Sequence, residues 1–417
     1  MNPSMNIIVI GAGPAGMMAA IRAAECADGV ALFEKNASAG RKLGLTGKGR
    51  CNLTNVASCD DFLDKFGREG QFLRDAIKKL SSERVMDFFE SNGLKLKVER
   101  QGRVFPETDS SRSVIDILER VLKRRGVNMF FSSAVRNILV ADGCVKGVRL
   151  ADMKEIRAKK IILACGGASY PETGSTGDGF RMAHDLGHCI TDIFAGLVPL
   201  ETEEAFVKDL QGLTLKNISI VFELGKKKVA SGVGELLFTH FGVSGPLVLD
   251  LSSKVVGLSK GKPFKLFIDL KPGLSGNELE EKLEREFSQG GSLAIKNYLK
   301  ELVPERLGNV VLSNAKIEPL KKCHQISAVE RKSLVNILKR FHLVIKKPRP
   351  LSEAMVTCGG VSLKEVDPRT MESKIAKGMY LCGEVLDLSA SSGGYNLQAA
   401  FSTGYMAGEA AGLSCAS

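Results

Sequence analysis

Residues 6–16 read NIIVIGAGPAG, and this stretch decides the expected fold. Its apolar beginning is typical of a short buried β-strand. Three glycines follow at the spacing G-x-G-x-x-G, and then comes MMAAIRAAEC, a run typical of a helix. Gly11 permits a tight turn, Gly13 leaves room for a pyrophosphate, and Gly16 lets the helix pack closely on the strand. The stretch therefore predicts a strand–turn–helix unit whose helix start binds phosphate.

A second apolar run, VALF at residues 30–33, ends at Glu34. Glu34 lies 23 residues after Gly11. Dinucleotide-binding units place an acid about 20 residues after the first glycine, where it bonds ribose hydroxyls. An ordinary βαβ unit with a solvated glutamate is the alternative. Order and spacing favour the dinucleotide site, whose first candidate residues are Gly11, Gly13, Pro14, Ala15, Gly16, Glu34 and Lys35.

Length and composition limit the classes of protein to which this chain can belong. A chain of 417 residues is too long for one ordinary core and predicts two or three domains. No run reaches the roughly 18 consecutive apolar residues of a membrane span, so we expect no membrane partner. The first expected strand begins within a few residues of Met1, so we expect no signal peptide. The 10 cysteines have no CxxC or zinc-type spacing, so we expect reduced thiols, a cytoplasmic location and no metal site.

The net charge is +11, with basic clusters at residues 123–125, 226–228 and 346–349. Attraction for anionic cofactors and solubility account for such a charge. A nucleic-acid surface is the sharper alternative. The chain has no tryptophan and 5 tyrosines, so aromatic platforms for bases are scarce. Nucleic acid is therefore the disfavoured partner, and a small molecule is the expected substrate.

Residues 40–55 read GRKLGLTGKGRCNLTN and have no helix or strand periodicity. Backbone amides, Arg and Lys can bind phosphates here, and Asn and Thr can bond the edge of a ring. A flexible surface loop is the alternative. Lys48 and Arg50 are expected to lower the pKa of Cys51, which is either a reactive thiol or a packing residue. The candidate residues of this loop are Arg41, Lys42, Gly47, Arg50, Cys51 and Asn52.

Later segments add further walls to the expected site. A strand around residues 127–136 passes the expected adenine position, where Val135 either offers backbone bonds or packs in the core. The strand at 160–165 ends in Gly166, and a glycine turn at a strand end lets backbone approach a ligand. The strand at 379–382 precedes Glu384, which either bonds a ribityl chain or is a surface acid. Small residues near the next helix start let a flat ring approach, and the helix dipole stabilises negative charge on it. The C-terminal candidates are Gly383, Glu384, Asn396, Leu397 and Gln398.

The middle of the chain separates the N-terminal and C-terminal parts of the expected site. Residues 198–272 read as strands with polar turns, and residues 273–351 read as helices. We therefore expect one discontinuous α/β domain, residues 1–197 with 352–417, carrying a β-rich and a helical inserted domain, with a cleft where they meet. His240 is a candidate proton donor, although a lone histidine in such a loop is usually structural.

Several motifs together resemble the BaiN-like NAD(P)/FAD-dependent oxidoreductases, bacterial flavoproteins with a glutathione-reductase-type FAD domain. The resemblance implies a Rossmann-like FAD-binding domain with a β-barrel-like insert and a helical insert. It implies FAD in the glycine fingerprint, with contacts at Ala15, Glu34, Arg41, Lys42, Val135, Glu384 and Leu397. One member type reduces carbon–carbon double bonds in steroid-like substrates, but no residue here selects a steroid. The motifs are GAGPAG, RKLGLTGKGRCNLTN, GGASYPETGSTGDGF, FTHFGVSGP, YLCGEVLD, GGYNLQ and STG.

The CxxxxC pair of glutathione reductase relatives and a second complete GxGxxG are absent from the sequence. We therefore expect neither disulfide reduction nor a separate NAD(P)H domain. The expected activity is hydride transfer from NAD(P)H through FAD to a small organic acceptor, such as a carbon–carbon double bond. The alternatives are an FAD-containing RNA-binding or tRNA-modifying protein, and a structural protein with a degenerate site. No pattern indicates an oligomeric state.

Overall fold

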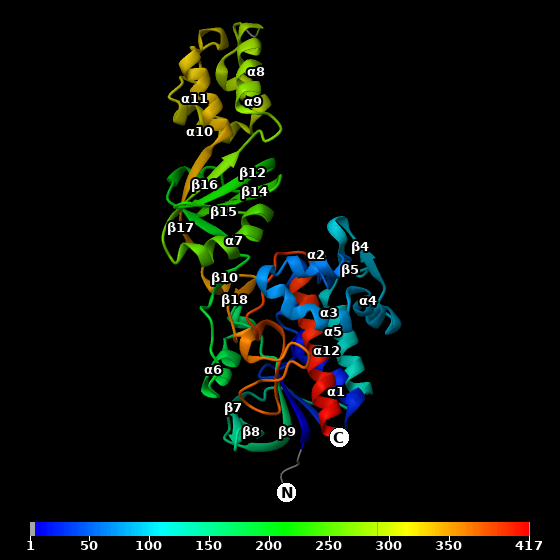
Figure 1. Ribbon diagram of the computed structural model, residues 1–417. Coiled ribbons are helices and arrows are strands. Elements are labelled where there is room, and N and C mark those ends of the chain that lie inside the picture. The colour runs from blue at the N-terminus through cyan, green and yellow to red at the C-terminus, as the bar shows by residue number, and fades with distance from the viewer. Residues whose placement is uncertain (1–4, 290, 417) are drawn as a thin grey trace. The chain divides into compact units, whose positions relative to one another are not determined.

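A computed structural model describes residues 5–289 and 291–416 (Figure 1). The chain divides into two compact units. The terminal unit comprises Met1–Phe194 and Leu351–Ser417, and the inserted unit comprises Ala195–Pro350. Strands and helices of the middle segment share the inserted unit, so its further division near residue 272 stays a prediction.

A parallel sheet forms the centre of the terminal unit. β1 (Met5–Ile10) lies between β2 (Val30–Phe33) and β9 (Glu155–Leu163) and runs parallel to both. β6 (Asn128–Phe130) pairs with β2, and β19 (Met379–Leu381) pairs with β9. The side chains of β2 are buried throughout, as in a sheet covered on both faces. The Rossmann-like α/β fold expected from the sequence is thus confirmed, and the strands end together at one edge.

An antiparallel extension continues from β9. β7 (Val135–Ala141) pairs with β8 (Cys144–Leu150), and β8 pairs with the first half of β9. The strand expected at residues 160–165 is thus the second half of the longer β9. Its first half pairs with β8, and its second half pairs with β1.

The two ends of the chain meet in a helix pair. α1 (Pro14–Cys26) and α12 (Tyr395–Ala416) lie side by side, blue and red in Figure 1. At Gly404 and Gly408 of α12, an added Cβ would stand 2.3 and 2.2 Å from backbone carbonyl oxygens of α1. Close backbone approach therefore requires small residues along α12, and it places the start of α12 beside the first glycine turn.

β4 (Leu96–Val98) and β5 (Arg103–Pro106) form an antiparallel hairpin. Gln101 and Gly102 have φ values of +62° and +71°, the left-handed conformation that reverses the chain. The other helices and strands of the terminal unit are β3 (Thr54–Asn55), α2 (Cys59–Asp64), α3 (Arg74–Lys79), α4 (Ser82–Ser91), β4 (Leu96–Val98), β5 (Arg103–Pro106), α5 (Ser111–Arg124), α6 (Asp178–Asp185) and β18 (Val356–Cys358).

The inserted unit contains a closed antiparallel sheet. Its strands follow the order β12-β14-β15-β11-β17-β16, and β16 pairs back with β12. This ring confirms the β-barrel-like insert. β13 pairs with the end of β12, beyond the stretch that pairs with β14, and β10 (Phe194–Gly196) spans the boundary between the units. The barrel strands and β13 are β11 (Leu200–Thr202), β12 (Thr214–Leu224), β13 (Lys227–Ala230), β14 (Gly234–Phe238), β15 (Gly242–Ser244), β16 (Phe264–Asp269) and β17 (Phe341–Pro348).

Helix α7 (Pro246–Ser259) lies in a region that was expected to hold only strands and turns. Pro246 occupies the start of this helix, where proline is favoured, so the dipeptide Gly245-Pro246 was an available signal. Among the described residues, four α-helices stand between β16 and β17 in the chain. They are α8 (Gly276–Gln289), α9 (Ile295–Leu302), α10 (Glu305–Ala315) and α11 (Ala328–Lys339). Over the described part of the chain, no helix combines the length and apolar character needed to cross a membrane.

Candidate dinucleotide site

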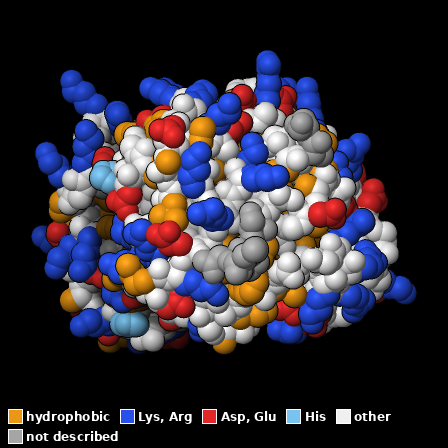
Figure 2. All heavy atoms as spheres, turned by 90° about the horizontal axis from the view of Figure 1, so that it is seen from below, with side chains coloured by type: hydrophobic (Ala, Val, Ile, Leu, Met, Phe, Trp, Pro, Cys, Tyr) orange, Lys and Arg blue, Asp and Glu red, His pale blue; other side chains and the backbone are white. Residues whose placement is uncertain are grey.

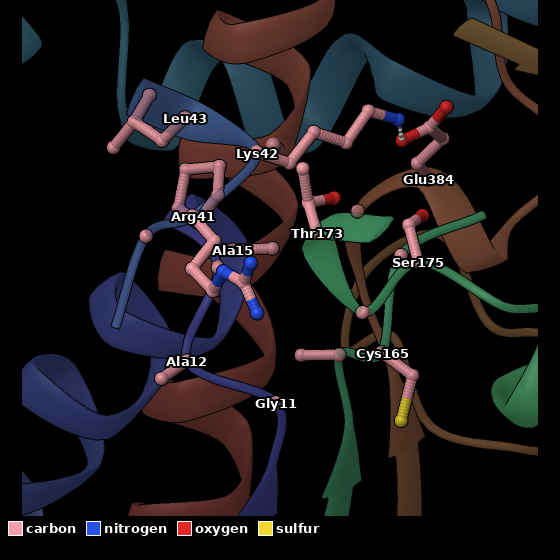
Figure 3. A pocket seen from close by; sticks show the side chains of 18 of the residues that line it. Gly11, Ala12, Ala15, Arg41, Lys42, Leu43, Cys165, Thr173, Ser175 and Glu384 are labelled. Atoms are coloured by element: carbon pink, nitrogen blue, oxygen red, sulfur yellow. Dashed lines mark hydrogen bonds and ion pairs between the residues drawn. The ribbon is translucent and has the colours of Figure 1, made fainter. Parts of the chain in front are cut away.

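A pocket lies within the terminal unit, where β1, β2 and β9 end. Its walls come from the glycine turn after β1, the segments that follow β2 and β9, and the start of α12. Figure 3 shows Gly11, Ala15 and Arg41 on one side of the pocket and Cys165, Thr173 and Ser175 on the other. Segments more than 300 residues apart in the sequence therefore form one site, as expected from the motifs.

The three fingerprint glycines have different surroundings. An added Cβ on Gly11 would lie 2.6 Å from the carbonyl oxygen of Ala164, and one on Gly16 would lie 1.9 Å from that of Gly11. An added Cβ on Gly13 would meet nothing within 4 Å. The first and third glycines therefore serve close packing of strand and helix, while the second borders open space in the pocket.

The start of α1 is arranged for an anion. Gly13 is its N-cap residue, no side chain caps it, and Pro14 stands at the first helical position. The unpaired amides of a first turn carry the positive end of the helix dipole. A phosphate group in the pocket would therefore find backbone donors at this turn.

Glu34 stands at the end of β2 and is held by the chain around it. One carboxylate oxygen accepts from the backbone amide of Ala12 (2.8 Å). The other accepts from the backbone and side-chain amides of Asn36 (2.8 and 2.7 Å). A carboxylate offers about four lone-pair sites, so Glu34 keeps acceptor capacity for a ribose hydroxyl.

The cations of the pocket differ in their partners. Lys35 pairs with Asp178 (2.6 Å), and Lys42 pairs with Glu384 (2.6 Å, dashed in Figure 3). Burial is the largest single influence and would raise the pKa of Asp178, but the hydrogen bond and charge of Lys35, together with Thr176 and Arg181, lower the pKa below its usual value. Arg41 bonds the side-chain oxygen of Asn36 (3.0 Å) and has no carboxylate partner in the described part of the chain. Its guanidinium is thus the pocket cation best placed to bind a ligand phosphate.

The opposite wall holds a buried hydroxyl with no partner. Ser175 is 6% exposed, and its Oγ makes no hydrogen bond within the described residues. Beside it, burial raises the pKa of the Cys165 thiol to about 12, so this cysteine is a neutral wall residue. A buried hydroxyl without a partner is costly unless a ligand or water bonds it. The sequence pointed to the glycine turn that carries Ser175 but not to this side chain.

The C-terminal candidates have distinct places. Glu384 and Leu397 line the pocket, and Glu384 also accepts from the backbone amide of Thr357 (2.7 Å). Asn396 lines it too, although its side chain bonds both backbone groups of Ala390 (2.9 Å). Gln398 points elsewhere: it is fully buried and bonds Thr54 (2.6 Å) and the carbonyl of Leu80 (2.8 Å).

The candidates divide into two groups by position. Six of them do not line the pocket: Gly16, Gly47, Arg50, Cys51, Asn52 and Gln398. The others do, namely Gly11, Gly13, Pro14, Ala15, Glu34, Lys35, Arg41, Lys42, Val135, Gly166, Gly383, Glu384, Asn396 and Leu397. Their roles as FAD contacts stay predictions.

The second half of the basic loop is bound to the protein itself. Arg50 pairs with Glu99 and with Asp109 (2.7 Å), and its guanidinium lies 4.2 Å from the ring centre of Phe105. Cys51 is fully buried, and burial raises its pKa to about 12. The expectation that Lys48 and Arg50 lower this pKa is wrong, because burial raises it and the opposing influence comes from a hydrogen bond with Thr46.

His240 belongs to the inserted unit and does not line this pocket. It is exposed, and its ring lies against that of Phe241, with centres 4.9 Å apart. Its role as a proton donor stays a prediction.

The comparisons with known proteins cover nearly the whole chain. The family model described as HI0933-like protein Rossmann domain matches residues 5–410. A 3-dehydro-bile acid delta(4,6)-reductase of Clostridium scindens is 33% identical over 97% of this chain and 98% of its own. A ribosomal RNA dihydrouridine synthase of Haemophilus influenzae is 28% identical over 95% of this chain and 96% of its own.

Solved structures support the fold. A 3-ketosteroid delta1-dehydrogenase of Sterolibacterium denitrificans matches with a TM-score of 0.55 and 13% identity, over 99% of this chain and 100% of its own. At this identity the match shows the fold alone. The family model and the Clostridium relative decide the family: this chain belongs to the HI0933-like family, and its resemblance to the BaiN-like flavoproteins is confirmed.

Proposed function

We propose that this protein is an FAD-dependent oxidoreductase whose FAD lies extended in the pocket of the terminal unit. The observation that carries the proposal is the first glycine turn. Gly13 faces open space, α1 has no side-chain cap, and the free amides meet a pocket that continues to the start of α12. The partnerless hydroxyl of Ser175 fits a ligand-binding wall as well.

The chain's own groups have complementary tasks in this proposal. The first turn of α1 and Arg41 bind the pyrophosphate, and Glu34 orients a ribose. Val135 borders the adenine end, and Glu384 and Leu397 border the ring end. When bound, FAD supplies hydride transfer, while the protein binds and orients it. The helix start near Asn396 favours negative charge at the ring end of the pocket.

The proposed electron donor is NAD(P)H, and the proposed acceptor is a carbon–carbon double bond beside a carbonyl group. Two relatives along the whole chain support this acceptor, because the names delta(4,6)-reductase and dihydrouridine synthase both describe saturation of such a bond. The substrates differ greatly in size, so the shared element is the bond that is reduced.

Anaerobic spectroscopy tests the proposal. We expect purified protein to be yellow and to bleach when NADH or NADPH is added. A steroid with a 3-oxo-Δ4 group, or an RNA rich in uridine, should then restore the oxidised spectrum. A yellow protein that neither nicotinamide bleaches would contradict the proposed donor, and bleached protein that neither acceptor reoxidises would contradict the proposed acceptor.

RNA is a second candidate substrate because of where the charge lies. Residues 195–350 hold 25 Lys and Arg against 17 Asp and Glu, whereas the rest of the chain holds 33 against 30. The inserted unit therefore carries 8 of the 11 excess positive charges. Such a surplus attracts polyanions.

Mass spectrometry of nucleosides from treated RNA tests this candidate. A mass gain of two hydrogens on uridine supports it. Unchanged uridine, under conditions in which a steroid reoxidises the flavin, contradicts it.

A further inference from the structure

Positive charge is widespread on this protein, so charge alone does not locate a binding surface. Figure 2 shows Lys and Arg side chains spread over one face of the molecule, with Asp and Glu between them. A nucleic-acid surface should combine positive charge with rings on which bases can stack. One face of the inserted unit meets both conditions.

The strands of the barrel alternate between its inside and its outside. In β16, Phe264, Leu266 and Ile268 are buried, whereas Lys265 is exposed and Phe267 is half-buried. The neighbouring strands continue this outer row. Phe267 stands opposite Val221 of β12 on one side and His342 of β17 on the other. Phe267 is therefore an aromatic side chain on the outer face of the closed sheet.

Two side chains extend this ring into a platform. The ring of His342 is stacked beside that of Phe267, with centres 6.2 Å apart and planes 29° apart. The guanidinium of Arg340 lies 4.2 Å from the centre of the Phe267 ring. A planar cation on an aromatic face is the arrangement that also stacks with a nucleobase.

The platform is surrounded by lysines. Lys265 neighbours Phe267 on β16, Lys346 is exposed on β17, and Lys228 is exposed on β13. Two acids adjoin them: Glu223 pairs with Lys228 (3.0 Å) and Arg340 (3.4 Å), and Glu204 accepts from the backbone amide of Val344 on β17 (2.8 Å). The hydrogen bond from Lys228 holds the pKa of Glu223 below its usual value, so it stays charged and neutralises one of these cations. At the far end of β16, Asp269 pairs with Lys339 (2.7 Å). The face thus keeps a positive surplus.

We propose that this outer-face cluster binds single-stranded RNA, with bases stacked on the ring platform and phosphates on the lysines. The outer-face cluster consists of Lys228, Lys265, Phe267, Arg340, His342 and Lys346. The proposal deepens the second candidate function, from which it takes RNA as the partner. Unpaired bases are favoured over a duplex because only they expose the flat surface that stacks on Phe267.

Binding of a fluorescein-labelled 12-nucleotide oligouridine to the FAD-loaded full chain tests the proposal. Fluorescence anisotropy at several salt concentrations gives the dissociation constant and its salt dependence. The variant Lys265→Ala/Lys346→Ala should bind about tenfold more weakly, and its salt slope should fall by about 1.4, since each lost phosphate contact on a single strand removes about 0.7. Phe267→Leu keeps an apolar side chain but removes the stacking ring, and should weaken binding by about tenfold.

A matched control removes the same charge elsewhere in the inserted unit. Lys296 and Lys332 are exposed on α9 and α11, outside the outer-face cluster. Lys296→Ala/Lys332→Ala should change the dissociation constant less than twofold. Equal weakening by both double variants, or no effect of Phe267→Leu in a protein with unchanged Tm and FAD content, would overturn the proposal.

The two proposals can fail separately. If the cluster variants lose oligouridine binding but the wild-type protein never reduces uridine, the surface stands and the RNA-reductase candidate falls. If uridine is reduced while the cluster variants bind normally, that candidate stands and the outer-face cluster is wrong.

Discussion

The first glycine turn and the basic loop carry similar anion-binding groups in the sequence, but the structure uses them differently. In the turn at residues 11–16, Gly11 and Gly13 line the pocket, but only an added Cβ on Gly13 would meet nothing within 4 Å. In the loop at residues 40–55, Arg41 and Lys42 line the pocket, whereas Arg50 is bound by Glu99 and Asp109. The spacing of glycines therefore predicts the local backbone structure from the sequence alone. Whether a lysine or arginine is free to bind a ligand depends instead on carboxylates from distant parts of the chain.

The largest expected effect comes from Gly16→Ala. Its new Cβ would stand 1.9 Å from the backbone oxygen of Gly11, so strand and helix must separate. Overpacking of this kind costs about 3 kcal/mol, which should lower the Tm by several degrees. Thermal unfolding of the FAD-free protein measures this. Gly44→Ala is the control in the basic loop, because its Cβ would meet nothing within 4 Å. Equal Tm values for the two variants would show that the turn is not tightly packed.

Gly13→Ala separates binding from folding within the same turn. Its Cβ would also meet no protein atom within 4 Å, and the φ of −80° suits alanine. The Tm of the FAD-free protein should stay unchanged. The methyl group would occupy the space proposed for the pyrophosphate, so FAD should bind about 10- to 100-fold more weakly, equivalent to 1–3 kcal/mol of overpacking. Unchanged FAD affinity in calorimetry would place the pyrophosphate elsewhere.

A pair of arginine variants tests the division of the basic loop. Arg41→Ala should weaken FAD binding about tenfold, because it removes a charge-assisted hydrogen bond to phosphate. Arg50→Ala should change FAD affinity less than twofold and lower the Tm slightly, because its partners Glu99 and Asp109 belong to the protein. Calorimetric titration of both variants gives the comparison. The reverse order of effects would mean that the loop turns its other half toward the cofactor.

Cys51 should give the smallest effect. The thiol is fully buried with a pKa raised to about 12, so it stays neutral from pH 7 to pH 10. Cys51→Ala should keep turnover within twofold. In the native protein, iodoacetamide should leave Cys51 unmodified over this range, whereas an exposed thiol of ordinary pKa near 8.5 reacts faster as the pH rises. Peptide mass spectrometry measures the labelling, and rapid labelling of Cys51 at pH 8 would show that the loop opens.

The sequence supported the fold wherever a residue's role depends on its near neighbours. The strand before Gly11, the glycine spacing and Glu34 predicted the Rossmann-like unit because strand, turn and helix are consecutive. The reappearance of such patterns after residue 355 also identified the middle as an insertion. Helix α7 was missed because its start, Gly245-Pro246, reads equally well as a turn between strands.

The remaining features of the site depend on contacts between distant segments. The ion pair of Lys42 with Glu384 joins positions 342 residues apart, and only the folded chain shows that the Ser175 hydroxyl is buried with no partner among the described residues. Cys51 was assigned a lowered pKa from its charged neighbours in sequence, whereas the structure buries the thiol and burial raises its pKa. The outer-face platform likewise needs Phe267 and His342 to stand on adjacent strands.

Titration of FAD into flavin-stripped protein tests the central claim most directly, namely that the first glycine turn binds the pyrophosphate of FAD. We expect the wild-type chain to bind one FAD, to recover a flavin absorption spectrum, and to lose the bound FAD to excess ADP. Gly13→Ala should show the weaker binding with an unchanged Tm. Folded wild-type protein that stays colourless, or equal FAD affinity for the two proteins, would contradict the account.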